Sequence, residues 1–217
     1  MKKLSLIVMS VGISLASFAN DPIKKENERI SLQSSDGGKC FDESTHIINV
    51  GIGVGSGYYY KRVGGKYSSS PAISLSYEQP WPQRLGPGYL GVGAYLGFQT
   101  SHYRYDYKHP SWWNNNNYYY EERWNHYIVT GRAAYHWDVL NSEKAEVYAG
   151  VIIGARFRTY SYTDNDPDYD YYNNGSAVSP AYSVFAGARY YFGKNIGVYA
   201  EVGYGISYGT VGLSIKF

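Results

Sequence analysis

The stretch Gly197–Phe217, GVYAEVGYGISYGTVGLSIKF, decides the fold that this sequence predicts. Apolar or aromatic residues hold every second position on both sides of a short bend, and glycine or polar residues fill the positions between them. Because strand side chains alternate between two faces, each run predicts a strand with one apolar face. The stretch therefore predicts a hairpin whose apolar side rests against either lipid or a protein core.

The opposite end of the chain bears on this choice. Residues 1–19 begin with two lysines after the initiator, continue with an apolar run and end in the small-x-small sequence Ser17-Phe18-Ala19. This pattern predicts a secretory signal peptide, because the apolar run is shorter than the ~20 residues of a spanning helix. Residues 20–45 are polar and predict a loose periplasmic leader. Its Cys40 is the only cysteine, so no intrachain disulfide can form.

The composition excludes some classes of partner. The chain has 20 Lys+Arg and 18 Asp+Glu, and removal of residues 1–19 takes away two lysines and no acid, which leaves 18 of each. A net charge near zero argues against nucleic acid as a partner, since that needs a basic surface. The 27 tyrosines and 25 glycines are far above ordinary usage.

Six further runs alternate in the same way before the final hairpin. Each has one apolar row and one row of small, polar or charged residues. With the two runs of Gly197–Phe217, they predict eight strands in one domain of residues 46–217. The six runs are His46–Gly55, Ala72–Glu78, Tyr89–Tyr103, Trp124–Trp137, Val147–Tyr160 and Ala181–Phe192.

The connections between these runs alternate between short and long. The long ones are Ser56–Ser70, Arg104–Arg123 and Ser161–Pro180. Outer-membrane barrels combine short periplasmic turns with long external loops, and an even strand number places both chain ends in the periplasm. A soluble lipocalin-like barrel would invert this pattern, with the apolar rows inside and the polar rows outside. We therefore expect an all-β, eight-stranded antiparallel transmembrane β-barrel.

Three short sequences carry a family resemblance: RAAYHW at Arg132–Trp137, VYAG at Val147–Gly150, and VYAEVGY at Val198–Tyr204, the last leading to the terminal Phe217. Through them, residues 46–217 resemble the small OmpA- and OmpX-like outer-membrane β-barrel family, in the tyrosine-rich style of Bacteroidota proteins. The resemblance implies residence in the Gram-negative outer membrane, in contact with lipid and lipopolysaccharide. Phe217, the terminal aromatic residue, resembles the signal by which the outer-membrane assembly machinery recognises such barrels. The resemblance leaves the activity open, because this fold hosts many functions.

The inward rows predict a polar network in the barrel. An eight-stranded barrel is just wide enough for side chains to fill, and charges there must be paired or hydrated. We expect Arg189, Arg132 or both to hold Glu201 in a structural plug; a narrow hydrated pore, or a proton-sensitive gate through His136, is the alternative. The predicted network comprises Glu78, Arg132, His136, Arg156, Arg158, Arg189, Glu201 and Lys216.

The long loops hold the strongest functional signal. Tyrosine and tryptophan offer rigid amphipathic contact area, the composition of recognition surfaces. They predict a non-catalytic protein that binds an extracellular ligand or shields the cell surface, with an adhesive or envelope-structural role; a small porin or channel is the runner-up. The candidate binding residues are Tyr58, Tyr59, Tyr60, Tyr105, Trp112, Trp113, Tyr118, Tyr119, Tyr120, Tyr169, Tyr171 and Tyr172.

Two other kinds of site are weaker. Ser101-His102 with His126 resembles part of the nucleophile and base of a lipid-modifying enzyme, yet strand parity turns His102 outward and His126 inward. The alternating acids of Asp164–Asp170 resemble half of a calcium loop, but Tyr169 stands where that loop needs glycine. We therefore expect no catalytic residue, no metal and no cofactor.

Overall fold

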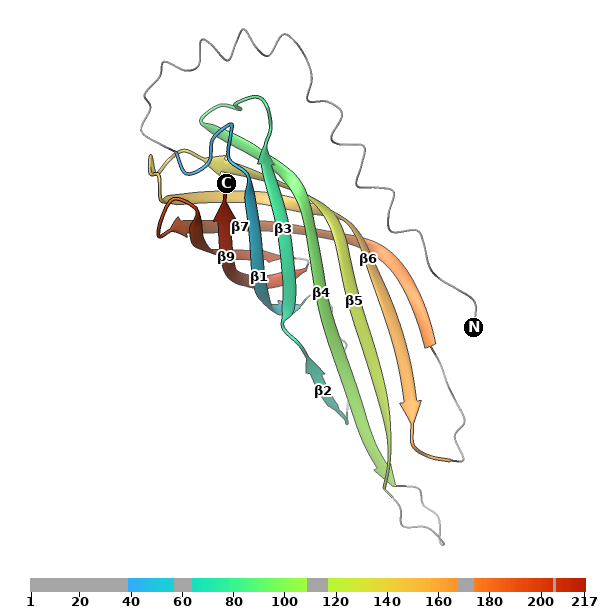
Figure 1. Ribbon diagram of the computed structural model, residues 1–217. Helices are drawn as coiled ribbons and strands as arrows, with labels where there is room; N and C mark the ends of the chain where they lie inside the picture. The colour runs from blue at the N-terminus through green and yellow to red at the C-terminus, as the bar shows by residue number, and fades with distance from the viewer. Residues whose placement is uncertain (1–38, 57–63, 109–116, 168–173, 205) are drawn as a thin grey trace. The chain divides into compact units, whose positions relative to one another are not determined.

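The computed structural model describes residues 39–56, 64–108, 117–167, 174–204 and 206–217. These residues form nine strands and none of them is helical, so this part of the chain contains no helix long and apolar enough to cross a membrane. The strands are β1 (Ile47–Ser56), β2 (Lys66–Ser69), β3 (Ala72–Pro80), β4 (Gly88–Lys108), β5 (Asn117–Trp137), β6 (Ala145–Asp164), β7 (Asn174–Tyr191), β8 (Ile196–Tyr204) and β9 (Ser207–Lys216) (Figure 1).

Eight of these strands form a closed antiparallel ring. Sequence neighbours pair with one another, and β1 closes the ring by pairing with β9, with Val50 opposite Leu213. Backbone hydrogen bonds between His46 and Phe217, at 2.9 and 3.0 Å, complete the closure. The short β2 pairs only with β4 and continues the line of β3 across Pro71, which has no N–H to donate. The eight-stranded antiparallel barrel predicted from the alternation is confirmed.

The strands differ strongly in length. Strands β4 to β7 have 18–21 residues, whereas β1, β3, β8 and β9 have 9–10. A register row of Thr100, Asn125, Thr159 and Ser176 crosses the long strands. Beyond this row they continue as an open sheet, here called the extension (Figure 1).

The extension corrects all three predicted long loops. Residues 66–69, expected within the loop Ser56–Ser70, form β2. Residues 104–108 and 117–123, expected within the loop Arg104–Arg123, belong to β4 and β5. Residues 161–164 and 174–180, expected in the loop Ser161–Pro180, belong to β6 and β7. The polar composition of these residues suggested loops. Strands are paired by backbone hydrogen bonds, however, and these form between polar residues as well as between apolar ones.

The outward face of the ring is an apolar belt. Leu96, Val151, Ile153, Val202 and Leu213, which belong to the apolar rows of the alternating runs, have 46–71% of their surface exposed. Along β4 the belt covers residues 90–98, close to the 9–11 residues of a tilted spanning strand. No charged side chain points outward from the described strands within this belt.

Candidate functional site

Aromatic side chains border the belt at both ends. At the end with short turns, hereafter the base, Tyr135 contacts Trp137 and Tyr190 contacts Phe192, with ring centroids 5.3 and 5.8 Å apart. At the other end Phe98 contacts Tyr127 at 5.2 Å. Two aromatic girdles around an apolar band are the exterior of a membrane barrel, because such rings sit at lipid–water interfaces.

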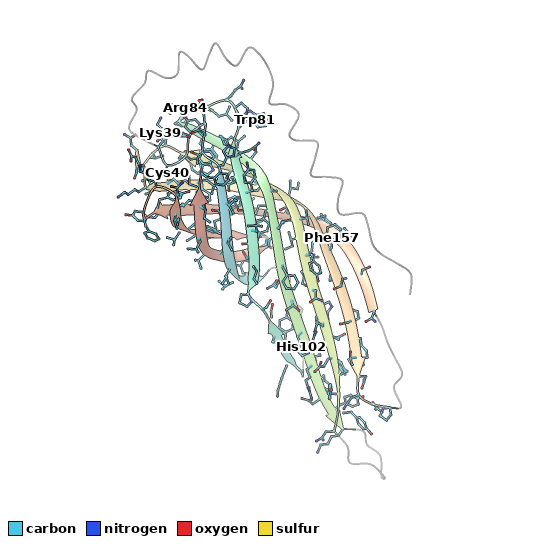
Figure 2. The ribbon with its side chains drawn as sticks, in the orientation of Figure 1. Lys39, Cys40, Trp81, Arg84, His102 and Phe157 are labelled. Atoms are coloured by element: carbon cyan, nitrogen blue, oxygen red, sulfur yellow. The ribbon has the colours of Figure 1, made fainter. Side chains whose placement is uncertain are left out.

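Polar chemistry begins immediately past the second girdle. Thr100 donates to Asn125 at 2.8 Å, and Asn125 donates to Thr159 at 3.3 Å. On the outer face of the extension Arg104 bonds Glu121 at 3.1 Å and Asp106 at 3.0 Å. Figure 2 shows Phe157 on the wall and His102 farther along the extension. The extension therefore stands outside the apolar belt.

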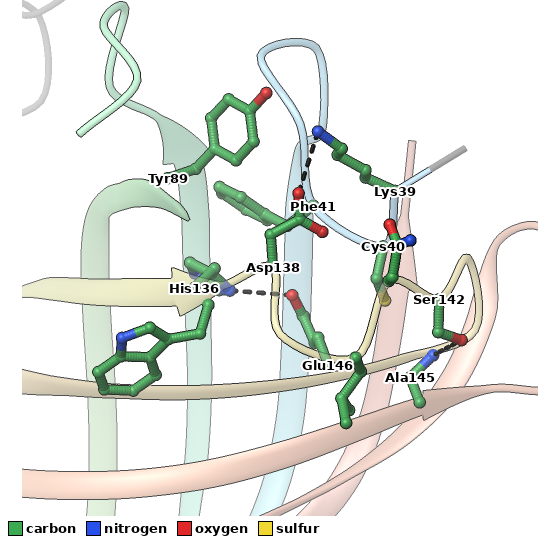
Figure 3. A pocket seen from close by; sticks show the side chains of 12 residues that line it. Lys39, Cys40, Phe41, Tyr89, His136, Asp138, Ser142, Ala145 and Glu146 are labelled. Carbon is green, nitrogen blue, oxygen red and sulfur yellow. Dashed lines mark hydrogen bonds and ion pairs between the residues drawn. The ribbon is translucent and has the colours of Figure 1, made fainter. Parts of the chain in front are cut away.

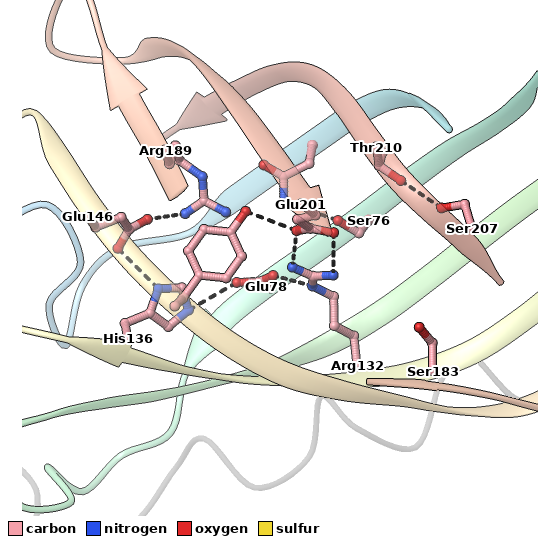
Figure 4. Close-up of polar contacts among 12 residues, drawn as sticks. Ser76, Glu78, Arg132, His136, Glu146, Ser183, Arg189, Glu201, Ser207 and Thr210 are labelled. Carbon is pink, nitrogen blue, oxygen red and sulfur yellow. Dashed lines mark hydrogen bonds and ion pairs between the residues drawn. The ribbon is translucent and has the colours of Figure 1, made fainter. Parts of the chain in front are cut away.

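Inside the ring, six ionisable side chains form one continuous chain of contacts, here called the ion chain. It runs in the order Glu201, Arg132, Glu78, His136, Glu146, Arg189 (Figure 4). All except Glu201 are at most 4% exposed. Buried charges are tolerated only when paired, and here opposite charges alternate along the chain.

Arg132 is the centre of the ion chain. Its Nη2 donates to Glu201 Oε1 at 2.6 Å and its Nε donates to Glu78, while its guanidinium lies 4.0 Å from the Phe185 ring centroid. Tyr148 also donates to Glu201 Oε1, at 2.9 Å. Gly187 makes this approach possible, since a Cβ there would come within 2.8 Å of both Glu201 and Tyr148. One wide cation thus joins two carboxylates from β3 and β8, which are not neighbours in the ring.

The structure brings five residues of the predicted network together: Glu78, Arg132, His136, Arg189 and Glu201. Glu201 is held by Arg132, as expected, but not by Arg189, which bonds Glu146 instead. Glu146 directly precedes the predicted run Val147–Tyr160, yet it has the inward parity of Tyr148 and lies in β6. Extending the alternation by one step would have found it.

Three predicted members lie outside the ion chain. Arg156 donates to Ser179 at 3.0 Å and, like Arg158, is only partly buried near the mouth of the ring. Lys216 donates to the Cys40 carbonyl at 3.4 Å and lies over the Tyr191 ring. Their inward parity was read correctly, but parity does not give depth along the barrel.

The interior around the ion chain is filled. An apolar cluster that includes Tyr95, Ile128, Ile152, Phe185 and Ile206 lies toward the mouth. Two cavities flank the ion chain, one of about 20 Å³ beside Glu201 and one of about 10 Å³ beside His136 and Glu146. Each is about the size of a single water molecule. This packing opposes free passage of solutes.

The extension carries the described aromatic candidates. Tyr103, Tyr105, Tyr107, Tyr118, Tyr120 and Tyr162 share its inner face, which continues the inward face of the ring; they are here called the tyrosine ladder. Tyr120 is its centre, with ring centroids of Tyr103, Tyr105, Tyr107 and Tyr162 at 5.5–6.3 Å.

Carboxylates border the ladder. Tyr107 donates to Asp164 at 3.2 Å and to Asp166 at 3.3 Å, and Tyr162 donates to Asp164 at 2.9 Å. Burial, followed by the charge of Asp164, raises the pKa of Tyr107 above its usual range. Tyr107 thus stays in its neutral, hydrogen-bonding form across the physiological pH range.

The other sequence candidates are placed as follows. Tyr119 lies on the opposite face of the extension, under Arg104 at 3.8 Å. Ser101 and His126 are buried on the inner face, whereas His102 points outward to Glu121 at 3.3 Å, so Ser101 and His102 do not converge. Eight binding candidates lie outside the described residues: Tyr58, Tyr59, Tyr60, Trp112, Trp113, Tyr169, Tyr171 and Tyr172. Asp168 and Asp170 of the calcium expectation also lie outside them.

Comparison with known proteins gives structural similarity only. No family model and no curated protein matches the sequence. The chain is similar to the N-terminal β-barrel domain of Pseudomonas aeruginosa OprF, with TM-score 0.41, 13% identity, and coverage of 81% of this chain and 98% of that one. The chain is also similar to Ail, the attachment invasion locus protein of Yersinia pestis, with TM-score 0.40, 14% identity, and coverage of 81% of this chain and 100% of that one. For Neisserial surface protein A the TM-score is 0.34 and the identity 16%, with coverage of 80% of this chain and 95% of that one.

These solved structures belong to the class that the sequence resemblance names, the small outer-membrane β-barrels. The fold of this chain rests on its own strand pairing, which closes eight antiparallel strands into a ring.

Proposed function

We infer that the protein is a non-catalytic outer-membrane barrel that binds an external ligand on the tyrosine ladder. The observation that carries this proposal is the position of the ladder, on a sheet that stands clear of the apolar belt. Stable anchoring needs only the ring, so a second, aromatic surface beyond it has no role in spanning the membrane.

The chemistry of the ladder favours a polysaccharide. Its partly exposed rings, those of Tyr105, Tyr107, Tyr120 and Tyr162, offer flat apolar contacts, while the phenol hydroxyls and the carboxylate of Asp164 offer hydrogen-bond partners at the ring edges. A sugar polymer has the matching combination of apolar ring faces and hydroxyl edges, repeated along its length. Tyrosine gives this contact at low entropic cost, since its side chain has two rotatable bonds.

The runner-up function, a small channel, is disfavoured by the filled interior. Conductance of the pure protein in planar bilayers discriminates the two: stable stepwise openings would favour the channel. The opposed faces of Ser101 and His102 weigh against a lipid-modifying enzyme, and an unchanged mass of lipid A after expression would weigh against it further.

Binding is tested with the full chain in nanodiscs on a panel of neutral, carboxylated and sulfated polysaccharides. Tyr105→Ala removes ladder contacts with Tyr107 and Tyr120. We expect it to weaken binding by about tenfold, the equivalent of about 1.4 kcal/mol. The matched control is Tyr119→Ala, which removes an aromatic ring from the opposite face. Equal loss in both variants, or no binding by the native protein to any polysaccharide, would contradict the proposal.

A further inference from the structure

Part of the predicted leader is built into the base of the barrel. Cys40 and Phe41 are each 4% exposed, and Lys39 bonds Asp138 in the β5–β6 turn at 3.0 Å (Figure 3). The Asp42 carboxylate accepts bonds from the Ser44 amide and the Thr45 hydroxyl, both at 2.8 Å, which folds the backbone into a tight turn. Residues 39–45, here called the base segment, are thus an ordered part of the barrel unit, contrary to the expectation of a loose leader.

The base segment makes its main contact with the ion chain. The Phe41 ring lies flat on His136, with ring centroids 3.8 Å apart and planes inclined by 6°. Phe41 also packs with Ile47 and Tyr89 in a small apolar cluster. A phenyl ring stacked on an imidazole is held more strongly when the imidazole is a cation.

The geometry around His136 requires that cation. Its Nδ1 lies 3.0 Å from Glu146 Oε2 and its Nε2 lies 3.1 Å from Glu78 Oε2. A neutral imidazole has one donor nitrogen and one acceptor nitrogen, so it satisfies only one ionised carboxylate. With both nitrogens protonated, His136 donates to both.

The charge of the ion chain leads to the same conclusion. Glu78, Glu146 and Glu201 contribute three negative charges, and Arg132 and Arg189 contribute two positive charges. A protonated His136 makes the sum zero, whereas a neutral His136 leaves one uncompensated negative charge in a buried site. The other titratable groups nearby are Tyr148, whose ring centroid lies 5.3 Å from that of His136, and four groups that line the cavity beside His136: the Cys40 thiol, Tyr89, and the ion pair of Lys39 with Asp138.

We propose that the base segment is a pH-dependent plug, held in the barrel by the protonated form of His136 and released when that ring becomes neutral. Loss of the proton weakens the stack on Phe41 and points a lone pair at a carboxylate oxygen. The plugged state therefore binds one more proton than the open state. By linkage, the plug is most stable at low pH and its stability falls as the pH rises.

Cys40 provides a native reporter of this opening, because it is the only cysteine of the chain. Burial, followed by the charge of Glu146, raises the pKa of Cys40 to about 12. Thiol reagents attack the thiolate, so the plugged state is doubly protected, by its inaccessibility and by its low thiolate fraction. Reaction with a maleimide then measures the open fraction.

The experiment measures maleimide labelling of the full chain in detergent micelles between about pH 6 and about pH 10. Each rate is divided by the rate of the urea-unfolded chain at the same pH, which removes the intrinsic pH dependence of the thiol, and circular dichroism confirms that the barrel stays folded. We expect the protection of Cys40 to fall by about tenfold or more across this range.

Two variants and one control sharpen the test. Phe41→Ala lies outside the strands of the ring, and we expect it to lose protection at every pH. His136→Gln cannot become a cation, and we expect low protection with no pH dependence. Glu43→Ala, at an exposed position of the base segment, should behave as the native protein does. Protection that is flat with pH in the native chain, or retained in Phe41→Ala, would overturn the proposal.

Discussion

The inner face of β5 has two different chemistries along its length. Within the ring it carries Arg132 and His136, which are joined to carboxylates from three other strands. In the extension it carries Tyr120 and Tyr118, which contact aromatic neighbours within the sheet. The alternation is the same in both regions, so the difference comes from what lies opposite.

This difference separates two ways of stabilising a sheet. In the closed ring the inward groups face other walls at short range and without bulk water, so each charge needs a partner across the barrel. In the part of the chain that the structure describes, no strand lies opposite the extension, because β1, β8 and β9 end earlier. Cross-strand stacking is then sufficient. We therefore expect mutations in the ion chain to affect the whole barrel, and mutations in the tyrosine ladder to have local effects.

The largest loss should follow Arg132→Gln. It leaves Glu201 with Tyr148 as its remaining donor and Glu78 with only His136, so two carboxylates become underpaired. We expect the free energy of unfolding to fall by about 3–5 kcal/mol. Urea unfolding in detergent measures it, and a loss below about 1 kcal/mol would show that the ion chain is not structural.

Glu201→Gln should have a smaller effect, about 2 kcal/mol, because a charge-assisted bond is lost while Arg132 keeps Glu78. The amide retains an acceptor oxygen for Tyr148, and the side chain of Glu201 is already 10% exposed. The same urea titration measures this loss. If Glu201→Gln proves more costly than Arg132→Gln, Arg132 is not the centre of the ion chain.

Val202→Ala, one residue away on the apolar belt, should cost less than about 1 kcal/mol. Val202 is 68% exposed on the protein surface, and in a membrane or micelle a hydrocarbon chain fills the space that its two methyl groups leave. The urea midpoint of this variant is the reference for both ion-chain variants. A loss as large as that of Glu201→Gln would argue against lipid contact at this position.

The smallest global effect should come from Tyr120→Ala, within about 0.5 kcal/mol of the native free energy of unfolding. Its effect should be local: faster amide exchange in the outer parts of β4, β5 and β6, with no change inside the ring, since the extension opens independently. Hydrogen exchange with mass spectrometry measures both regions. Faster exchange throughout the ring would mean that the two regions are one cooperative unit.

Much of the fold follows from local pattern. Alternation located every strand of the ring, and it also marked Val151 and Val202 as outward and Arg132 and Glu201 as inward. It stopped short where composition was used in its place: Tyr103, Tyr105 and Tyr107 alternate with charged residues, and this period of two was the available signal for the extension. Phe41, an aromatic residue in a polar leader, was the available signal for the base segment.

The sequence by itself determined the eight strands of the ring and the face of each of their side chains, because the period of a strand is two residues wherever it occurs. Only the tertiary structure decided that Arg189 bonds Glu146, that Arg132 joins Glu78 to Glu201, and that Phe41 lies on His136. The physical reason is that contacts across a barrel depend on the stagger between strands far apart in the chain. That stagger is fixed when the ring closes, and a shift in pairing register moves the groups that face one another.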